Sequence, residues 1–481
     1  MIWSAKSGIW RYGRRNQRAV KGIFARQPLA WTSRESDGPT LRRTLGWPAL
    51  TAIGLGTMLG GIFPTIGAGA HAAGPAVILA YVLSGFVSLC VALCYAEFAS
   101  MVPVAGSAYT YAYATLGEVV AWVIGWDLIL EYGLSVAPTA SSWSAYAQQV
   151  LGGIGIKLPV ALQTGAVASG QIDVIAALIV LVITVLVAIG IRESANVNGV
   201  LVVFQIVTMI VFVAATIHAV HGTYLHPFAP QGFHGIVAGT ALVFYAYIGF
   251  DTVTVASEEA RDPVRHVPVA IILALAIGAL LYVALTVCTV GVMAYQKLSE
   301  GAAMLDAVQA ATRNPVVFWI VALGGVAGNT TVMVTSLLGQ IRIFYVMARD
   351  RMLPPAVAKI HPRFRTPAMM TMITGGIVAV LAALLPLSDL LDFVNIGTLS
   401  AFAIVCAGVL VLRITQPNAE RPFRAPLVWL FTIAGSASCL FLITGLSLPT
   451  WVRFAVWFLI GIAIYAVYGY RKSRLRSLAP P

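Results

Sequence analysis

Long apolar runs alternate with short polar connections along almost the whole chain. A helix needs about 20 mostly apolar residues to cross the hydrocarbon core of a bilayer, and most of these runs are that long. Charged residues are rare inside them, and twelve can be counted. The pattern predicts an all-α integral membrane protein with twelve transmembrane helices, at residues 48–71, 75–100, 117–151, 172–191, 196–219, 233–260, 267–295, 314–347, 367–386, 388–413, 426–447 and 450–470.

Composition and charge support a membrane protein and set its orientation. Hydrophobic residues make up 59% of the chain and charged residues 10%, whereas a typical soluble domain has roughly 25% charged residues. With twelve spans, all but four of the 30 Lys and Arg fall on one face. The positive-inside rule puts that face and both termini in the cytoplasm, so the net charge of +12 gives no reason to expect nucleic acid binding. The four exceptions are Lys157, Lys297, Arg313 and Arg453.

Two of the predicted spans are interrupted at matching places. The run from Thr51 to His71 breaks at Gly60–Pro64, and the run from Phe233 to Ala260 breaks at Tyr247–Asp251. Non-helical backbone at membrane depth is tolerated only where it is buried in protein or lines a cavity. Paired breaks in the two halves of a chain indicate the substrate site of a transporter.

The paired breaks also divide the chain. Each would open a set of five spans, and an odd number of spans makes the second set inverted relative to the first. The sequence therefore predicts a five-plus-five inverted repeat with two appended C-terminal helices. Its parts are a basic segment at 1–47, the two repeats at 48–219 and 233–413, a hairpin at 426–470 and a tail at 471–481.

The residues at the breaks suit a zwitterionic ligand. Backbone N–H groups freed beside a half-helix N-terminus would bind a carboxylate, and carbonyls freed in the second break would hold an ammonium group. Aromatic rings just before the second break could cover the ligand. This combination suits an L-α-amino acid better than a sugar, a nucleobase or an inorganic ion. The candidate substrate-binding residues are Thr57, Gly60, Gly61, Ile62, Phe244, Tyr245, Ala246, Ile248 and Gly249.

Ionisable residues within the spans are few, and at membrane depth such residues are functional candidates by default. Asp127 and Glu131 are four residues apart and share one helical face. Asp251 follows the second break, and Glu97 lies near the end of the second span. Glu131 and Asp251 are candidates for binding a transported proton, or they are buried carboxyl groups satisfied by neighbouring helices.

Other chemistry is poorly supported by the sequence. The five cysteines lie inside spans, without zinc-ligand or disulfide spacing, and indicate ordinary packing residues. We find no serine–histidine arrangement at membrane depth, so we expect neither an enzyme nor a bound cofactor or metal. A channel is disfavoured because no repeated filter sequence is visible. The first 47 residues lack the apolar core of a cleavable signal.

Three stretches of the chain resemble the amino acid–polyamine–organocation superfamily, and within it the cationic amino acid transporter family of bacterial type. They are residues 125–132 (GWDLILEY), residues 244–251 (FYAYIGFD) and residues 338–350 (LGQIRIFYVMARD), supported by residues 190–194 (GIRES). The resemblance extends from about residue 40 to 470. It implies the LeuT-like five-plus-five fold and alternating access. It also implies that Tyr245 lies near the aromatic gate position and that Glu131 and Asp251 match carboxylates linked to proton sensing.

Two departures from the family pattern keep the mechanism open. Relatives carry Gly-x-Gly-Ile-Phe in the first break, but Gly60 and Gly61 are adjacent here, so the loop is one residue short. Gln205 stands where several proton-coupled relatives carry a lysine. The sequence thus predicts a secondary active transporter of L-amino acids in the inner membrane, either proton-coupled or not. The alternatives are a proton-independent facilitator or exchanger, and a membrane receptor that binds an amino acid without moving it.

Overall fold

The computed structural model describes residues 44–101, 107–156, 158–165, 170–190, 195–364 and 366–473. Most of the basic N-terminal segment, the end of the C-terminal tail and residues 191–194 of the family resemblance lie outside the described residues. Within them the chain forms helices and no extended strand, and an isolated bridge joins Leu45 and Ala260. The prediction of an all-α protein is confirmed.

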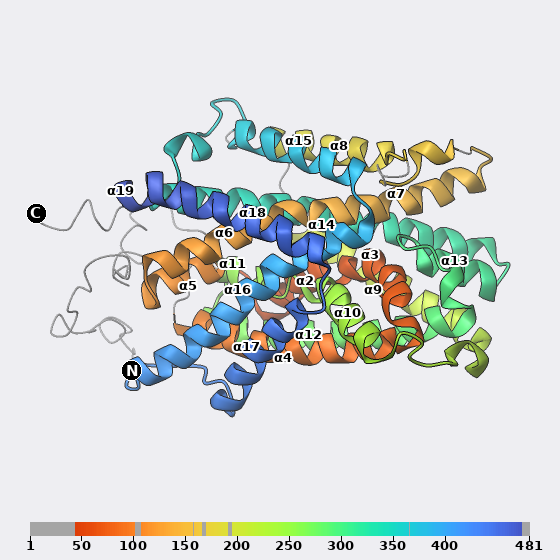
Figure 1. Ribbon diagram of the computed structural model, residues 1–481, viewed down its shortest axis with the longest axis horizontal. Coiled ribbons are helices and arrows are strands. Elements are labelled where there is room, and N and C mark those ends of the chain that lie inside the picture. Colours follow the sequence, from red (N-terminus) through yellow and green to blue (C-terminus); the bar gives the residue numbers. More distant parts are fainter. Residues whose placement is uncertain are drawn as a thin grey trace, which may run out of the picture.

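Helices run mostly along the long axis of the molecule (Figure 1). Helices α5 (Ser107–Thr115) and α19 (Tyr470–Lys472) lie at one end and α13 (Ala303–Ala311) at the other. The remaining α-helices are α2 (Trp47–Met58), α3 (Ile62–Ala73), α4 (Val77–Met101), α6 (Glu118–Leu134), α7 (Val136–Gly153), α8 (Val174–Ile189), α9 (Ala195–Thr216), α10 (Gly232–Val243), α11 (Thr252–Val255), α12 (Pro263–Val292), α14 (Pro315–Arg349), α15 (Ala368–Leu384), α16 (Leu387–Thr415), α17 (Val428–Ile443) and α18 (Leu448–Ile464).

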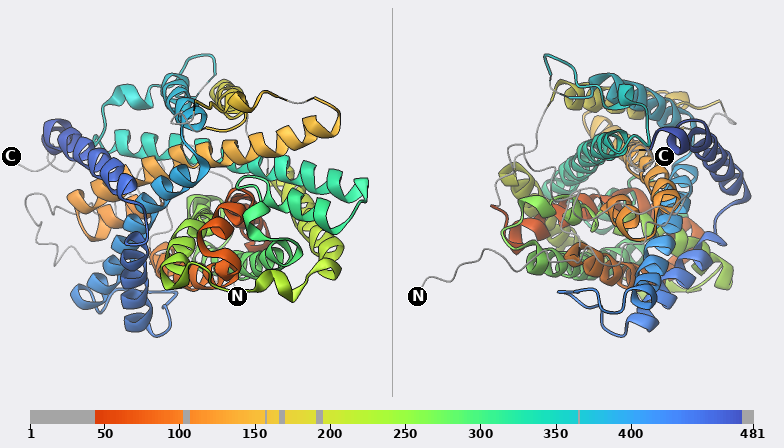
Figure 2. Two further views of the ribbon diagram at one scale, coloured as in Figure 1. Left: turned by 45° about the vertical axis from the view of Figure 1, so that its right-hand side comes forward. Right: turned by 90° about the vertical axis from the view of Figure 1, so that its left-hand side faces the viewer.

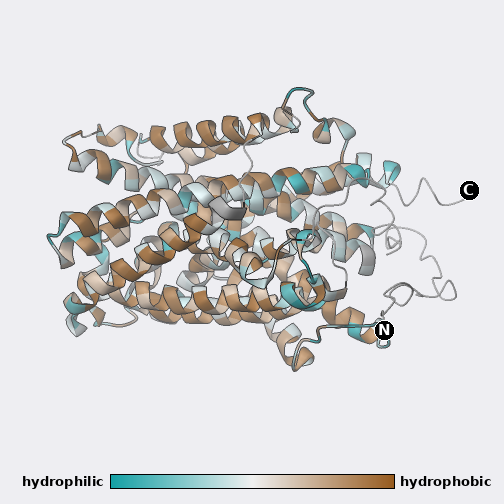
Figure 3. Ribbon diagram, turned by 180° about the vertical axis from the view of Figure 1, so that it is seen from behind, coloured by the Kyte–Doolittle hydropathy of each residue, from teal (hydrophilic) through white to brown (hydrophobic). Residues whose placement is uncertain are grey.

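Eight helical stretches of the described chain are long and apolar enough to cross a membrane, and three shorter apolar helices are α8, α15 and α17. The first stretch, Trp47–Met101, contains 55 residues and covers the first two predicted spans. Hydrophobic residues dominate along the helices, while hydrophilic residues gather toward the two ends (Figure 3). The chain is therefore a multi-pass membrane protein by length and composition, and its exact number of crossings stays a prediction.

The helices pack as a bundle, in which α8 and α15 lie side by side at one edge (Figure 2). Helix α12 packs along α4 and α2, and α14 packs along α7 and α9. All five cysteines are buried thiols (Cys90, Cys94, Cys288, Cys406 and Cys439). These contacts place the interrupted helices, α2–α3 and α10–α11, among neighbours from both halves of the chain.

A short backbone connection joins the chain before α2 to the chain after α11. The Leu45 N–H donates to the Glu259 carbonyl over 3.0 Å, and the Arg261 N–H donates to the Leu45 carbonyl over 2.9 Å. The two interrupted helices are thus held together at the end of the molecule where the first one begins.

Candidate functional site

The first break is shorter and more helical than the sequence suggests. Helix α2 ends at Met58, a single 3-10 turn covers Leu59–Gly61, and α3 begins at Ile62. Gly61 keeps helical angles, with φ −67° and ψ −17°. The expectation that the chain stops bonding to itself from Gly60 to Pro64 is wrong. Pro64 stands in the first turn of α3, where its missing N–H removes no helical hydrogen bond.

The second break is a true interruption. Helix α10 ends at Val243, a 3-10 turn covers Phe244–Tyr247, and Ile248 is extended with ψ 135°. Gly249 has φ +118°, a conformation that residues with a Cβ atom rarely adopt. The predicted break at Tyr247–Asp251 is confirmed, and it begins three residues earlier than expected.

Both breaks meet face to face in the interior. A Cβ atom on Gly61 would lie 2.9 Å from the Ala246 Cα atom, and one on Gly249 would lie 2.8 Å from the Thr57 Cγ2 atom. The Thr57 hydroxyl also lies 3.4 Å from the Thr252 hydroxyl. Direct contact of the two broken segments therefore brings together four of the predicted site residues: Thr57, Gly61, Ala246 and Gly249.

Gly60 packs in a different direction from Gly61. A Cβ atom there would lie 2.4 Å from the Val332 Cγ2 atom and 2.6 Å from the Gly328 carbonyl oxygen, both on α14. The two adjacent glycines thus allow one 3-10 turn to approach α14 on one side and the second break on the other. This close approach is the physical reason for two successive glycines at this place.

The two aromatic residues predicted to belong to the substrate site, Phe244 and Tyr245, contact different partners. The Tyr245 hydroxyl donates to the Ser135 carbonyl over 2.7 Å and lies 2.8 Å from the Thr139 hydroxyl, so this ring reaches toward α7. Phe244 packs edge to face against Phe402 of α16, with ring centroids 6.0 Å apart. Tyr245 is thus bonded to the start of α7, whereas Phe244 packs against α16. Ile62 is buried at the start of α3, and Ile248 packs against the core.

A tyrosine that the sequence analysis missed bonds to both breaks. The Tyr282 hydroxyl of α12 donates to the Ala246 carbonyl over 2.8 Å and also to the Met58 carbonyl. Its signal in the sequence is an aromatic hydroxyl at membrane depth, which needs a polar partner when it is buried. Nothing in the local pattern says that this partner is freed backbone 36 residues upstream.

Two of the predicted carboxyl groups also come together. Asp251 begins α11 and accepts a hydrogen bond from the Tyr132 hydroxyl over 2.8 Å. Glu131 precedes Tyr132 on α6, is fully buried, and interacts electrostatically with Asp251 and with Asp127. The hydrogen bond between Tyr132 and Asp251 thus joins α6, which also carries Glu131, to the second break.

Comparison with known proteins decides the family. A family model described as amino acid permease matches residues 45–469. The chain belongs to the amino acid permease family. It is 42% identical over 454 residues to the branched-chain amino acid permease BcaP of Bacillus subtilis, covering 93% of this chain and 97% of that protein. It is 38% identical over 462 residues to the methylthioribose transporter of the same organism, covering 95% and 100% respectively.

Eukaryotic transporters also match the chain. The vacuolar cationic amino acid transporter 4 of Arabidopsis thaliana is 36% identical over 395 residues, which cover 80% of this chain and 66% of that protein. These matches confirm the superfamily and the bacterial type that the sequence motifs indicate. Permeases and transporters are not enzymes, so the prediction on catalysis is confirmed as well.

Gln205, the departure from the family pattern, is buried in this permease. It lies on α9, which packs against α2 and α14. Neither the Oε1 nor the Nε2 atom of Gln205 has a hydrogen-bond partner among the described residues. In general, a buried amide that lacks hydrogen-bond partners lowers the free energy of unfolding.

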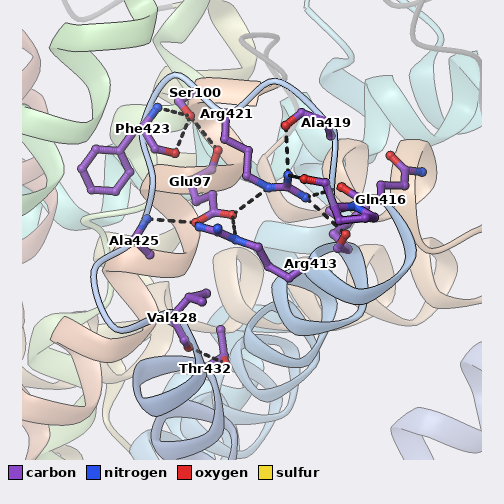
Figure 4. Close-up of polar contacts among 12 residues, drawn as sticks. Glu97, Ser100, Arg413, Gln416, Ala419, Arg421, Phe423, Ala425, Val428 and Thr432 are labelled. Carbon is purple, nitrogen blue, oxygen red and sulfur yellow. Dashed lines mark hydrogen bonds and ion pairs between the residues drawn. The ribbon is translucent and has the colours of Figure 1, made fainter.

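Glu97 forms a charge cluster away from the breaks, where α4 meets the connection between α16 and α17 (Figure 4). Its carboxylate receives two hydrogen bonds from the Arg413 guanidinium, of 2.8 and 2.6 Å, and one from the Ala425 N–H. Arg421 lies 3.3 Å from the same carboxylate and donates to four backbone carbonyls. Glu97 therefore serves to hold this connection in place.

Proposed function

We propose that this protein is a secondary transporter that moves L-amino acids across the bacterial inner membrane by alternating access. The observation that carries the proposal is the contact between the two broken segments, at Gly61 against Ala246 and Gly249 against Thr57. Irregular backbone at this depth is tolerated only where it is buried in protein or lines a cavity, and in transporters it forms the substrate site. Membership of the amino acid permease family and the names of the bacterial relatives support the substrate class.

The proposed topology has twelve crossings and both termini in the cytoplasm. Residues 48–219 and 233–413 would form the two inverted repeats, and residues 426–470 the appended hairpin. The distribution of Lys and Arg supports the orientation. The connection between Leu45 and Arg261 supports a unit in which the first and sixth spans move together.

At the proposed site, the start of α3 would receive the substrate carboxylate. Gly60, Gly61 and Ile62 supply that part of the backbone, and Thr57 lies one turn earlier. The carbonyls of Ala246, Ile248 and Gly249 would receive the ammonium group. Tyr245 would close over the ligand from its position against α7. Recognition by backbone groups suits a ligand that is bound through its α-amino and α-carboxyl groups, because these contacts do not depend on the side chain of the substrate.

For the side chain, we propose a branched-chain or other neutral aliphatic residue as the first substrate to test, since the 42% identical relative is a branched-chain amino acid permease. A second candidate is a methylthioribose-like thioether sugar, which the full-length match to that transporter favours. A sugar carries neither the ammonium nor the carboxylate that the two breaks suit.

Proton coupling through Glu131 and Asp251 is the preferred mechanism. Their mutual proximity supports it, because such a pair can gain and lose a proton as the second break moves. A facilitator or exchanger remains the alternative, because Gln205 cannot carry the charge of the lysine in related transporters.

Purified protein in liposomes tests these assignments. We expect uptake of labelled leucine that unlabelled valine inhibits, that methylthioribose leaves unchanged, and that an inward proton gradient stimulates. Inhibition by methylthioribose alone would favour the sugar. Uptake indifferent to the gradient would establish a facilitator or exchanger. Binding without counterflow would mean a receptor and would overturn the transport proposal.

A further inference from the structure

Three buried tyrosines stand behind the two breaks and form one packed cluster. They are Tyr81 on α4, Tyr247 in the second break and Tyr282 on α12, and we call them the tyrosine cluster. Ring centroids of Tyr247 and Tyr282 are 5.2 Å apart, those of Tyr81 and Tyr282 are 5.8 Å apart, and those of Tyr81 and Tyr247 are 6.4 Å apart. None of the three exposes any surface.

The hydroxyl groups of this cluster reach backbone carbonyls of both breaks. Tyr282 bonds to the carbonyls of Met58 and Ala246, which belong to different broken helices. The Tyr81 hydroxyl lies 2.8 Å from the Thr65 hydroxyl, which donates to the Gly61 carbonyl over 2.7 Å. Tyr247 donates to the Tyr81 carbonyl over 2.8 Å and so ties the second break to α4.

Tyr282 is the member that joins the two breaks directly. A carbonyl oxygen has two lone pairs, so accepting from Tyr282 leaves Ala246 able to accept a second hydrogen bond from a ligand. The one hydroxyl proton of Tyr282 is shared between the carbonyl oxygens of Met58 and Ala246. Both oxygens are therefore held close to the same hydroxyl group. The hydroxyl is neutral, and it therefore links the two segments without the desolvation cost that a buried cation would bring.

We propose, on the basis of the function proposed above, that Tyr282 is a positioning residue for substrate binding. It fixes the carbonyl of the second break against the end of α2, so that the groups receiving the common part of an amino acid are arranged before the substrate arrives. Preorganised groups bind more tightly because the ligand does not have to order them.

The experiment compares Tyr282→Phe with Tyr146→Phe. Tyr146 is an equally buried membrane tyrosine whose hydroxyl has no hydrogen-bond partner among the described residues, so it is a matched control. For Tyr282→Phe we expect KM for uptake to rise about 5- to 10-fold, while the maximal rate stays within about 2-fold of the wild-type rate. The reason is that weaker substrate binding raises KM without changing the maximal rate. We expect the same rise in KM for leucine, valine and alanine, because the positioned backbone groups bind the part of the substrate that these amino acids share.

Amide hydrogen exchange gives a second readout that does not depend on a known substrate. In Tyr282→Phe we expect faster exchange in peptides covering both 58–62 and 246–249, with no such change in Tyr146→Phe. Unchanged exchange in both breaks overturns the proposal. So does a KM change that differs between substrates, or one that equals that of the control. If the wild type transports no amino acid while the exchange result holds, only the proposed function fails.

Discussion

The two breaks look alike in the sequence but solve different physical problems. In the first, Gly60 and Gly61 keep helical angles, and what they provide is the absence of a side chain where α14 and the second break come close. In the second, Gly249 provides a backbone angle, φ +118°, which releases the chain from the helix. Glycine thus supports close approach in one segment and irregular conformation in the other. The comparison teaches that a glycine pair alone does not tell an unwound segment from a tightly packed one.

The largest effect should come from adding bulk to the first break. Gly61→Val places a branched side chain against the Ala246 backbone, which cannot rotate away as a side chain could. We expect leucine uptake to fall more than about 100-fold, which corresponds to about 2.7 kcal/mol. Uptake in liposomes measures this. Gly376→Val on α15 is the control, because a Cβ atom there meets nothing within 4 Å. Near-normal uptake by Gly61→Val would remove the first break from the site.

A smaller loss should follow from a methyl group in the second break. Gly249→Ala combines an unfavourable backbone angle, worth about 1–3 kcal/mol, with a contact to the Thr57 side chain at 2.8 Å. We expect uptake to fall about 10-fold, in line with about 1.4 kcal/mol. Adding Thr57→Ser removes the contacted methyl group, and we expect it to restore part of the loss. Gly232→Ala, which has φ +61° but open space, should retain activity. Full rescue by Thr57→Ser would show that the angle carries no cost.

The carboxyl pair distinguishes the two breaks, because Asp251 follows the second break and its partner Glu131 lies on α6, so neither belongs to the first break. Asp251→Asn keeps an acceptor for the Tyr132 hydroxyl and removes the titratable group. We expect proton-gradient stimulation to disappear while leucine counterflow stays within about 2-fold, since exchange needs no net proton movement. Asp389→Asn is the control, because that carboxylate pairs with Arg453 near the start of α16. Stimulation that survives in Asp251→Asn, and also in Glu131→Gln, would exclude this pair as the coupling site.

The smallest effect concerns Gln205 on α9, beside the helix that leads into the first break. Gln205→Met removes two unpartnered polar atoms and keeps the size of the side chain. We expect the free energy of unfolding to rise by up to about 1 kcal/mol, with uptake nearly unchanged. Thermal unfolding in detergent measures the change. Asn395→Leu should act in the opposite direction, because that amide donates to the carbonyls of Ala241 and Leu242. Loss of uptake in Gln205→Met would show that the amide itself binds something during transport.

Helix content, the two interruptions and the family could all be predicted from the sequence. Hydropathy over about 20 residues is a strong local signal, and the motif around Asp251 is specific. The extent of the first break could not be predicted, because Pro64 is equally compatible with a broken segment and with the first turn of a helix. The partners of Tyr282 and Phe244 could not be predicted for a related reason. A tyrosine or phenylalanine in a span shows that a ring is buried, but its partner depends on helices distant in the sequence.

All five natural cysteines are buried, so the protein is suited to site-specific labelling of introduced thiols. Because the whole sequence contains no other cysteine, a thiol introduced at an exposed position would be the one group that a water-soluble maleimide reaches readily. Pairs of spin labels or fluorophores could then be attached without first removing the natural residues. Distances between α2 and α14 could be followed through the transport cycle in an otherwise unaltered chain.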